Sequence, residues 1–159
     1  MFPHLGIMPF SYMRPVKYYD KAEKYYKKSL EIDPEYVNSL GNYAGFLLAR
    51  GDEKGFDLLW KAIELEENDP LHDDLKLECQ FYRYAHIEDL TSRTEALNRI
   101  RGLLQEGIRS PGWVLSENVK RAIEDGHPHP EFLTKLSKVI SDEIDIKELD
   151  KFEEWEENN

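Results

Sequence analysis

The chain has 159 residues, 40% of them hydrophobic and 33% charged, which suits one helix-rich domain large enough to bury a core. Its net charge of −11 argues against nucleic-acid binding, because phosphate contacts depend on lysine and arginine. No apolar run approaches the roughly 20 residues that a membrane span needs, and the single cysteine has no partner for an intramolecular disulfide. We therefore expect a cytoplasmic protein that does not span a membrane.

The first sixteen residues show no helical period, because Pro3, Pro9 and Pro15 interrupt them and interior proline breaks a helix. We expect an irregular N-terminal cap over 1–16 that lies on the first full helix. Its apolar side chains are Phe2, Leu5, Met8, Phe10, Tyr12 and Met13. The segment lacks a basic start, so it makes a poor secretory signal.

Three helices are expected next, over 19–32, 36–50 and 53–65. The first stops at Asp33-Pro34, since the residue before proline disfavours the helical conformation. Gly51-Asp52 separates the second and third, because glycine suits the residue after a helix and aspartate can cap the helix that follows. Two antiparallel helices joined by a short turn are predicted here.

One sequence pattern typical of a helix occurs twice in this region. KKSLEIDP aligns with WKAIELEEND, so that Ser29 matches Ala62 and Leu30 matches Ile63, and a period of roughly 34 residues is typical of helical-hairpin repeats. The residues at fixed offsets are Tyr19, Ala22, Tyr26, Pro34, Leu40, Tyr43, Leu47, Gly51, Asp52, Leu59 and Ala62. These residues resemble the tetratricopeptide repeat (TPR) family over about one and a half units. Gly55 stands where the second helix of the family usually has alanine.

The resemblance implies an all-α fold of stacked antiparallel helical hairpins, a TPR-like α-solenoid whose units share a core. In TPR proteins the first helix of each hairpin lines a concave groove. The resemblance assigns five groove residues here: Asn38, Gly41, Asn42, Gly45 and Ala49. The spacing of 38, 42, 45 and 49 also makes one helical stripe, and its amides suit a peptide backbone. Alternatively, the small residues only let the next hairpin pack closely.

The repeat pattern loosens over 71–141, where divergent helical hairpins are predicted. The last segment, 142–159, is strongly acidic: residues 141–159 contain nine acids and two bases. Within it, Ile146, Leu149, Phe152 and Trp155 recur at near-helical spacing. We expect a capping helix with a polar outer face, which repeat stacks need for solubility. The whole chain, 1–159, is thus interpreted as one helical repeat domain, with TPR-like repeats over 17–70.

The turn Gly126-His-Pro-His-Pro130 contains the most suggestive metal ligands. His127 and His129 alternate and could bind a metal together with Glu124 or Asp125. With no further histidine or cysteine nearby, we interpret the turn as proline-stiffened with exposed imidazoles. No metal site is predicted.

Two further residues have a structural interpretation. Cys79 lies at core spacing, so we expect a small buried hydrophobe rather than a nucleophile. Trp113 follows Ser-Pro-Gly and could be an exposed recognition residue, but we expect it to fold back as a lid on the last hairpin. The sequence has no phosphate-binding glycine loop, no GxSxG and no HExxH. Neither an enzyme nor a cofactor is predicted.

The sequence therefore predicts a non-enzymatic TPR-like protein-protein interaction module that binds a peptide or partner protein on its concave face. The negative charge favours a basic partner through faster encounter. The alternative is a structural unit that associates end to end, or the C-terminal part of a longer repeat array. The basic stretch Arg14–Lys28 and the acidic stretch 141–159 would then support salt-sensitive self-association.

Overall fold

The computed structural model describes residues 16–67 and 72–156, and every regular element in this part is helical, which confirms the predicted all-α class. Its elements are α2 (Val16–Ile32), α3 (Val37–Ala49), α4 (Lys54–Glu66), α5 (Asp73–His86), α6 (Leu90–Gln105), α7 (Ser116–Glu124), α8 (Pro130–Ile140) and the 3-10 helices η2 (Ile146–Leu149) and η3 (Glu153–Trp155). The predicted cap, apart from Val16, lies outside the described residues. None of the described helices has the length and apolar character needed to cross a membrane.

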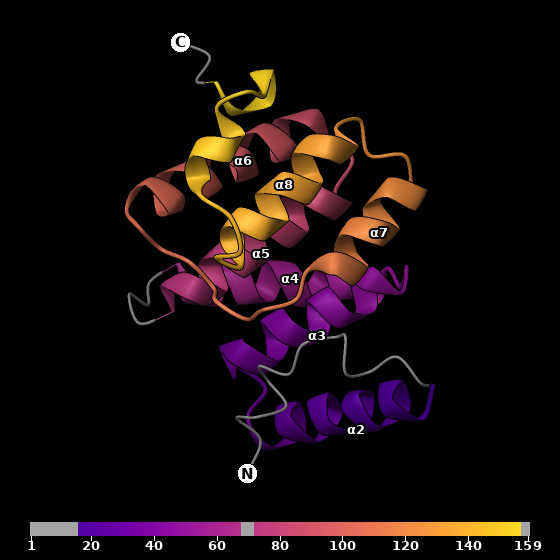
Figure 1. Ribbon diagram of the computed structural model, residues 1–159. Helices are drawn as coiled ribbons and strands as arrows, with labels where there is room; N and C mark the ends of the chain where they lie inside the picture. Colours follow the sequence, from indigo (N-terminus) through magenta and orange to yellow (C-terminus); the bar gives the residue numbers. More distant parts are fainter. Residues whose placement is uncertain (1–15, 68–71, 157–159) are drawn as a thin grey trace.

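Two helical hairpins form the centre of the molecule. Helices α3 and α4 pack along each other, as do α5 and α6, and α5 lies against both α3 and α4 (Figure 1). This packing of neighbouring hairpins fits a helical repeat. Helix α2 packs on α3 at the outer end, where Tyr26 stacks on Tyr43 with ring centroids 5.2 Å apart.

The turn between α3 and α4 forms as the sequence predicts. Gly51 has φ 75°, a conformation that favours glycine. Its N–H donates to the Leu48 carbonyl oxygen, and the Asp52 N–H donates to the Leu47 carbonyl oxygen, which is the Schellman pattern. Asp52 Oδ1 then accepts from the Lys54 N–H at 3.0 Å, so the aspartate satisfies the first N–H of α4, although Glu53 holds the N-cap position.

Helix α3 is enclosed by its neighbours. Residues 39–48 are all buried, because α2, α4, α5 and α7 pack around the helix. Helix α7 contacts both α3 and α5, and α8 packs on α7 and α5 (Figure 1). The C-terminal half of the chain therefore covers the first helices of both central hairpins.

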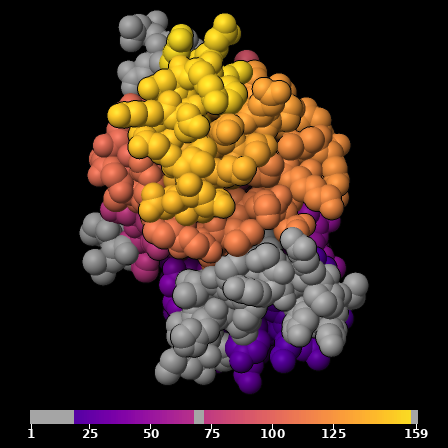
Figure 2. All heavy atoms as spheres, viewed as in Figure 1, coloured from indigo at the N-terminus to yellow at the C-terminus, as the bar shows by residue number. Residues whose placement is uncertain are grey.

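The prediction of a C-terminal capping α-helix is wrong, because the segment forms another type of helix. The segment forms two short 3-10 helices, although Leu149 and Trp155 are buried and Ile146 and Phe152 pack on the core as expected. These four positions recur every three residues, which is the period of a 3-10 helix rather than of an α-helix. In the space-filling view this segment (yellow) lies against the orange α7–α8 region, away from α2 (indigo) (Figure 2).

Candidate functional site

Of the predicted groove residues, Gly41 and Gly45 face α5, and Gly45 also contacts α7, whereas Ala49 packs on the cluster between α2 and α3. Gly41, Asn42 and Gly45 are buried, whereas Asn38 and Ala49 stay partly exposed. A Cβ atom at Gly41 would lie 2.9 Å from Leu75 Cδ1, and one at Gly45 would meet the ring of Tyr82. The two glycines therefore let α5 approach α3 closely, as the alternative interpretation of the stripe expects.

Helix α7 covers the same face. Asn118 of α7 is fully buried, and its Nδ2 donates to the Gly45 carbonyl oxygen at 3.0 Å. The same Nδ2 lies 3.0 Å from His86 Nε2 at the end of α5. A peptide could reach Asn42 or Gly45 only after α5 or α7 moved away, so partner binding there stays a prediction.

A different surface is open. One stripe along α4 and its two flanking residues, which we call the α4 face, lines two surface clefts. It consists of Glu53, Phe56, Trp60, Ile63 and Glu67, which follow one another at helical spacings of three and four. This surface is not among those that the sequence predicts.

The first cleft, of about 580 Å³, lies between the α3–α4 turn, the first half of α4, the end of α5 and α7. Its lining residues are Leu48, Gly51, Asp52, Glu53, Phe56, Trp60, His86, Ile87, Glu88, Arg121 and Asp125. Arg121 pairs with Asp125 at 3.2 Å. Among the described residues, Asp52, Glu53 and Glu88 have no ionic partner, so this cleft is acidic.

Trp60 forms the aromatic wall of the first cleft. Its side chain is 44% exposed, whereas Trp113 and Trp155 are 5% and 8% exposed. The Arg83 guanidinium lies 5.1 Å from the Trp60 ring centroid and is held by Glu95 at 2.6 Å. An exposed indole beside carboxylates is a combination that attracts cations.

The second cleft, of about 310 Å³, lies between the end of α4, α5 and α6. Its lining includes the carboxyl-bearing Glu66, which is buried and whose two oxygens accept no regular hydrogen bond from the described chain. Burial raises the pKa of Glu66 to about 8, and the Cys79 thiol and the charge of Lys76 only partly oppose this shift.

Glu78 is a second buried acid close by on α5. The Ser110 hydroxyl donates to its Oε2, which ties the loop before α7 to α5. Burial raises the pKa of Glu78 to about 8, and nearby Asp74 and Glu66 add to the rise. Since Glu78 lines neither cleft on the α4 face, its role is to connect elements of the core.

The two histidines of the HPHP turn differ from each other. His127 is buried, so the prediction of two exposed imidazoles is wrong for this residue. Its Nδ1 accepts from the His129 N–H at 3.1 Å, its ring packs on Tyr84, and burial lowers its pKa to about 4. His129 is exposed, with Nδ1 3.1 Å from Glu154 Oε1. Within residues 16–67 and 72–156, no three His, Cys, Asp or Glu side chains are grouped to hold a metal ion.

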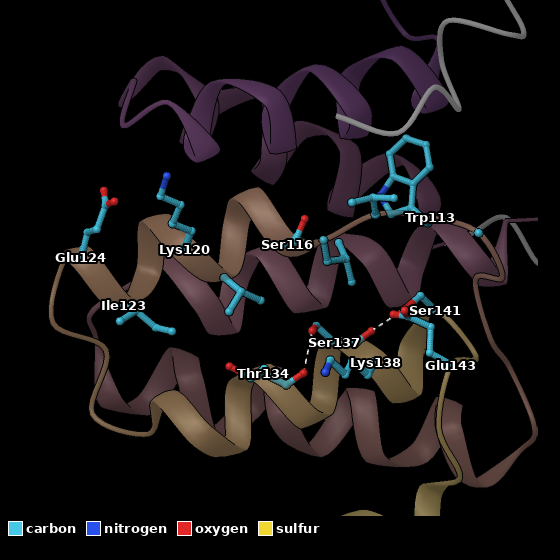
Figure 3. A pocket seen from close by; sticks show the side chains of 14 residues that line it. Trp113, Ser116, Lys120, Ile123, Glu124, Thr134, Ser137, Lys138, Ser141 and Glu143 are labelled. Carbon is cyan, nitrogen blue, oxygen red and sulfur yellow. Dashed lines mark hydrogen bonds between the residues drawn. The ribbon is translucent and has the colours of Figure 1, made fainter. Parts of the chain in front are cut away.

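Cys79 and Trp113 are both buried, as predicted. Trp113 folds back on α5, where its Nε1 donates to Tyr82 Oη at 2.9 Å. It also lines a groove of about 650 Å³ between α7 and α8, into which Ile123 projects (Figure 3). The charges of this groove are balanced, Lys120 and Lys138 against Glu124 and Glu143, so they select no particular occupant.

Comparison of the chain with protein-family models, with curated proteins and with solved structures gave no match. The TPR resemblance therefore stays a prediction. The hairpin packing of α3–α6 fits it, but the burial of the α3 stripe separates the chain from the groove arrangement that the resemblance implies.

Proposed function

We propose that the chain is a non-enzymatic, TPR-like interaction module that binds a basic peptide segment of a partner protein along the α4 face. The observation that carries this proposal is the first cleft, where the exposed ring of Trp60 lies among carboxylates that have no ionic partner in the described chain. A lysine or arginine side chain satisfies both features, because it pairs with a carboxylate and stacks on an aromatic ring.

The dimensions of the α4 face suit a short extended peptide. Fourteen helical steps separate Glu53 from Glu67, which corresponds to about 21 Å along the axis. An extended chain covers that distance with roughly six residues. Because the net charge of the chain is −11, long-range electrostatic attraction also speeds its encounter with a basic segment.

The proposal is tested by fluorescence titration with an eight-residue peptide of alternating lysine and alanine, compared with its glutamate counterpart. Trp60 is the most exposed of the three tryptophans, so the lysine peptide should change its emission, with an affinity that falls as salt rises. Anisotropy of a fluorescently labelled lysine peptide measures binding without Trp60, and by this readout the variants Trp60→Leu and Asp52→Asn/Glu53→Gln should bind at least tenfold more weakly. Glu64→Gln, an exposed α4 residue outside both clefts, serves as the matched control. Equal binding of both peptides, or no binding of either, would overturn the proposal.

A second candidate, end-to-end assembly, is favoured by the charge at the two ends. Figure 1 shows α2 at the opposite end of the molecule from η2 and η3. Helix α2 contains five lysines against three acids, and residues 142–156 contain eight acids against two lysines. Mass measured in solution at low and high salt tests this role: salt-sensitive oligomers would support it, and a monomer under both conditions would contradict it.

A further inference from the structure

The second cleft extends the α4 face beyond Trp60. Two polar side chains that are almost wholly buried line it, Glu66 at 2% exposure and Gln80 at 3%. The remaining lining residues are Ile63, Glu67, Lys76, Arg99, Gly102, Leu103 and Glu106. The lining thus combines apolar Ile63 and Leu103 with charged side chains, and buried polar groups such as Glu66 are the kind that orient a ligand in a binding site.

Glu66 is the unusual member of this lining. Both of its oxygens are buried without a regular hydrogen-bond partner in the described chain, and buried polar groups in proteins are almost always paired. The thiol of Cys79, a weak donor, interacts with the carboxyl group. A stronger donor that enters the cleft would hydrogen-bond to these oxygens and so remove the free-energy cost of burying them unpaired.

The cations of the cleft do not supply that donor. Lys76 Nζ lies 3.4 Å from Asp73 Oδ1, and Arg99 Nη2 lies 3.5 Å from Glu67 Oε1. Both basic side chains thus face other carboxylates at the rim, and neither hydrogen-bonds to Glu66.

The wall formed by α6 leaves room for an incoming side chain. Gly102 lies in the last turn of α6, which ends at Gln105, and a Cβ atom added there would have no neighbour within 4 Å. Glycine in a helix interior costs stability relative to alanine. Because Gly102 lines the cleft, a larger residue at this position would extend into open space there and reduce the cleft.

We propose that this cleft receives one lysine or arginine side chain of the same basic partner, whose cationic nitrogen hydrogen-bonds to the Glu66 carboxylate. The inference rests on the proposed function, since it assigns a second anchor point on the α4 face. Two anchors, at Trp60 and Glu66, would fix the register of a bound peptide.

Binding in this way changes the protonation of the site. Burial raises the pKa of Glu66 to about 8, so this side chain is mostly protonated at pH 7 when no peptide is bound. A cation favours the carboxylate, so the carboxyl O–H bond breaks and its proton passes to the buffer, while the incoming nitrogen keeps its own protons. The charged and titratable groups around Glu66 are Asp74, Lys76, Glu78 and Cys79 of α5, Arg99 and Glu106 of α6, and Glu67 beside it.

Calorimetric titration of the full chain with the lysine–alanine peptide at pH 7, in phosphate and in Tris buffer, measures this proton, because the two buffers differ in ionisation enthalpy. We expect release of close to one proton by the wild type and by Glu64→Gln, and of none by Glu66→Gln. Affinity should rise up to tenfold per pH unit between about 6.5 and 7.5 for the wild type and for Glu64→Gln, but not for Glu66→Gln.

Gly102→Phe, which fills the cleft and keeps Glu66, should also abolish proton release, while the Trp60 emission still responds to the peptide. A Trp60 response without proton release from the wild type would overturn this inference and leave the proposed function standing. Proton release that persists in Glu66→Gln would overturn it as well. No Trp60 response to the peptide would instead overturn the proposed function, and the inference with it.

Discussion

The side-chain amide of Asn118 donates a hydrogen bond to the backbone carbonyl oxygen of Gly45 at 3.0 Å, which joins α7 to α3. The two residues are far apart in sequence, and both are buried. The contact lies on the side of α3 that the TPR resemblance assigns to ligand binding. The C-terminal half therefore packs on this side of α3, whereas the α4 face lines two surface clefts.

Replacement of Asn118 by alanine should destabilise the chain by about 1–3 kcal/mol, because it removes a buried hydrogen bond and leaves a small cavity between α3 and α7. Urea denaturation measures the change. Glu117→Ala, on the neighbouring position of α7, is the control and should stay within about 0.5 kcal/mol of the wild type. Equal midpoints for all three proteins would show that this contact does not hold α7 in place.

The two helical glycines Gly45 and Gly102 should respond to alanine with opposite signs. A Cβ atom at Gly45 would overlap the Tyr82 ring, so Gly45→Ala should destabilise by about 1–3 kcal/mol despite its better helix propensity. The Cβ atom at position 102 would enter open space, so Gly102→Ala should stabilise the fold by about 0.5–1 kcal/mol. Thermal denaturation of both variants tests the pair; stabilisation by Gly45→Ala would contradict the close approach of α5 to α3.

Stability should fall as pH rises from about 6.5 to 8. Burial raises the pKa of Glu66 and Glu78 to about 8, so between about pH 4 and 8 the folded chain holds protons that the unfolded chain has lost. The stability that these protons contribute is present below about pH 4 and is lost as pH rises through 8. Each carboxyl should contribute a slope of up to about 1.4 kcal/mol per pH unit.

The buried histidines act in the opposite direction at lower pH. Burial lowers the pKa of His86 and His127 to about 4, so the unfolded chain binds their protons first and stability falls as pH drops from about 6.5 to 4. Below pH 6.5 the carboxyl groups and the histidines change the stability in opposite directions as pH changes. Above pH 6.5 only the carboxyl groups affect the stability. Urea titrations at pH 5.5, 6.5 and 8 measure this profile. Glu66→Gln should reduce the slope of unfolding free energy against pH above pH 6.5. An unchanged slope in this variant would show that Glu66 is not one of the groups responsible.

Arg101 should hold the C-terminal segment on α6. Its guanidinium donates to the carbonyl oxygens of Glu154 and Trp155 at 3.3 and 3.2 Å and lies 5.0 Å from the Trp155 ring centroid. Arg101→Ala should therefore expose Trp155, which acrylamide quenching detects in a Trp60→Phe background. Arg99→Ala, which removes an exposed ion pair, is the control and should leave the quenching unchanged.

Local structure could be predicted well because its causes are local. The Asp33-Pro34 stop and the Gly51-Asp52 turn depend on neighbouring residues, and both form as expected. The C-terminal segment was mispredicted, although its signal was present: the apolar residues from Ile146 to Trp155 recur every three positions, a 3-10 period.

The candidate site could not be predicted in the same way, because it depends on long-range packing. A stripe of small residues on α3 suits either a ligand or a closely packed helix, and only the positions of α5 and α7 decide which. The sequence did contain one signal for the α4 face. Phe56 and Trp60 lie at helical spacing on a side of α4 that does not coincide with the deeply buried Leu59 and Ala62.

Chemical-shift mapping distinguishes the α4 face from the α3 stripe as the surface that binds a basic partner. Amide spectra of the ¹⁵N-labelled chain would be recorded while the lysine–alanine peptide is added. We expect the largest shifts over residues 51–67 and at Gly102, with little change over 38–49. Shifts centred on Asn38, Asn42 and Ala49, with none along α4, would contradict the claim and restore the groove that the sequence predicts.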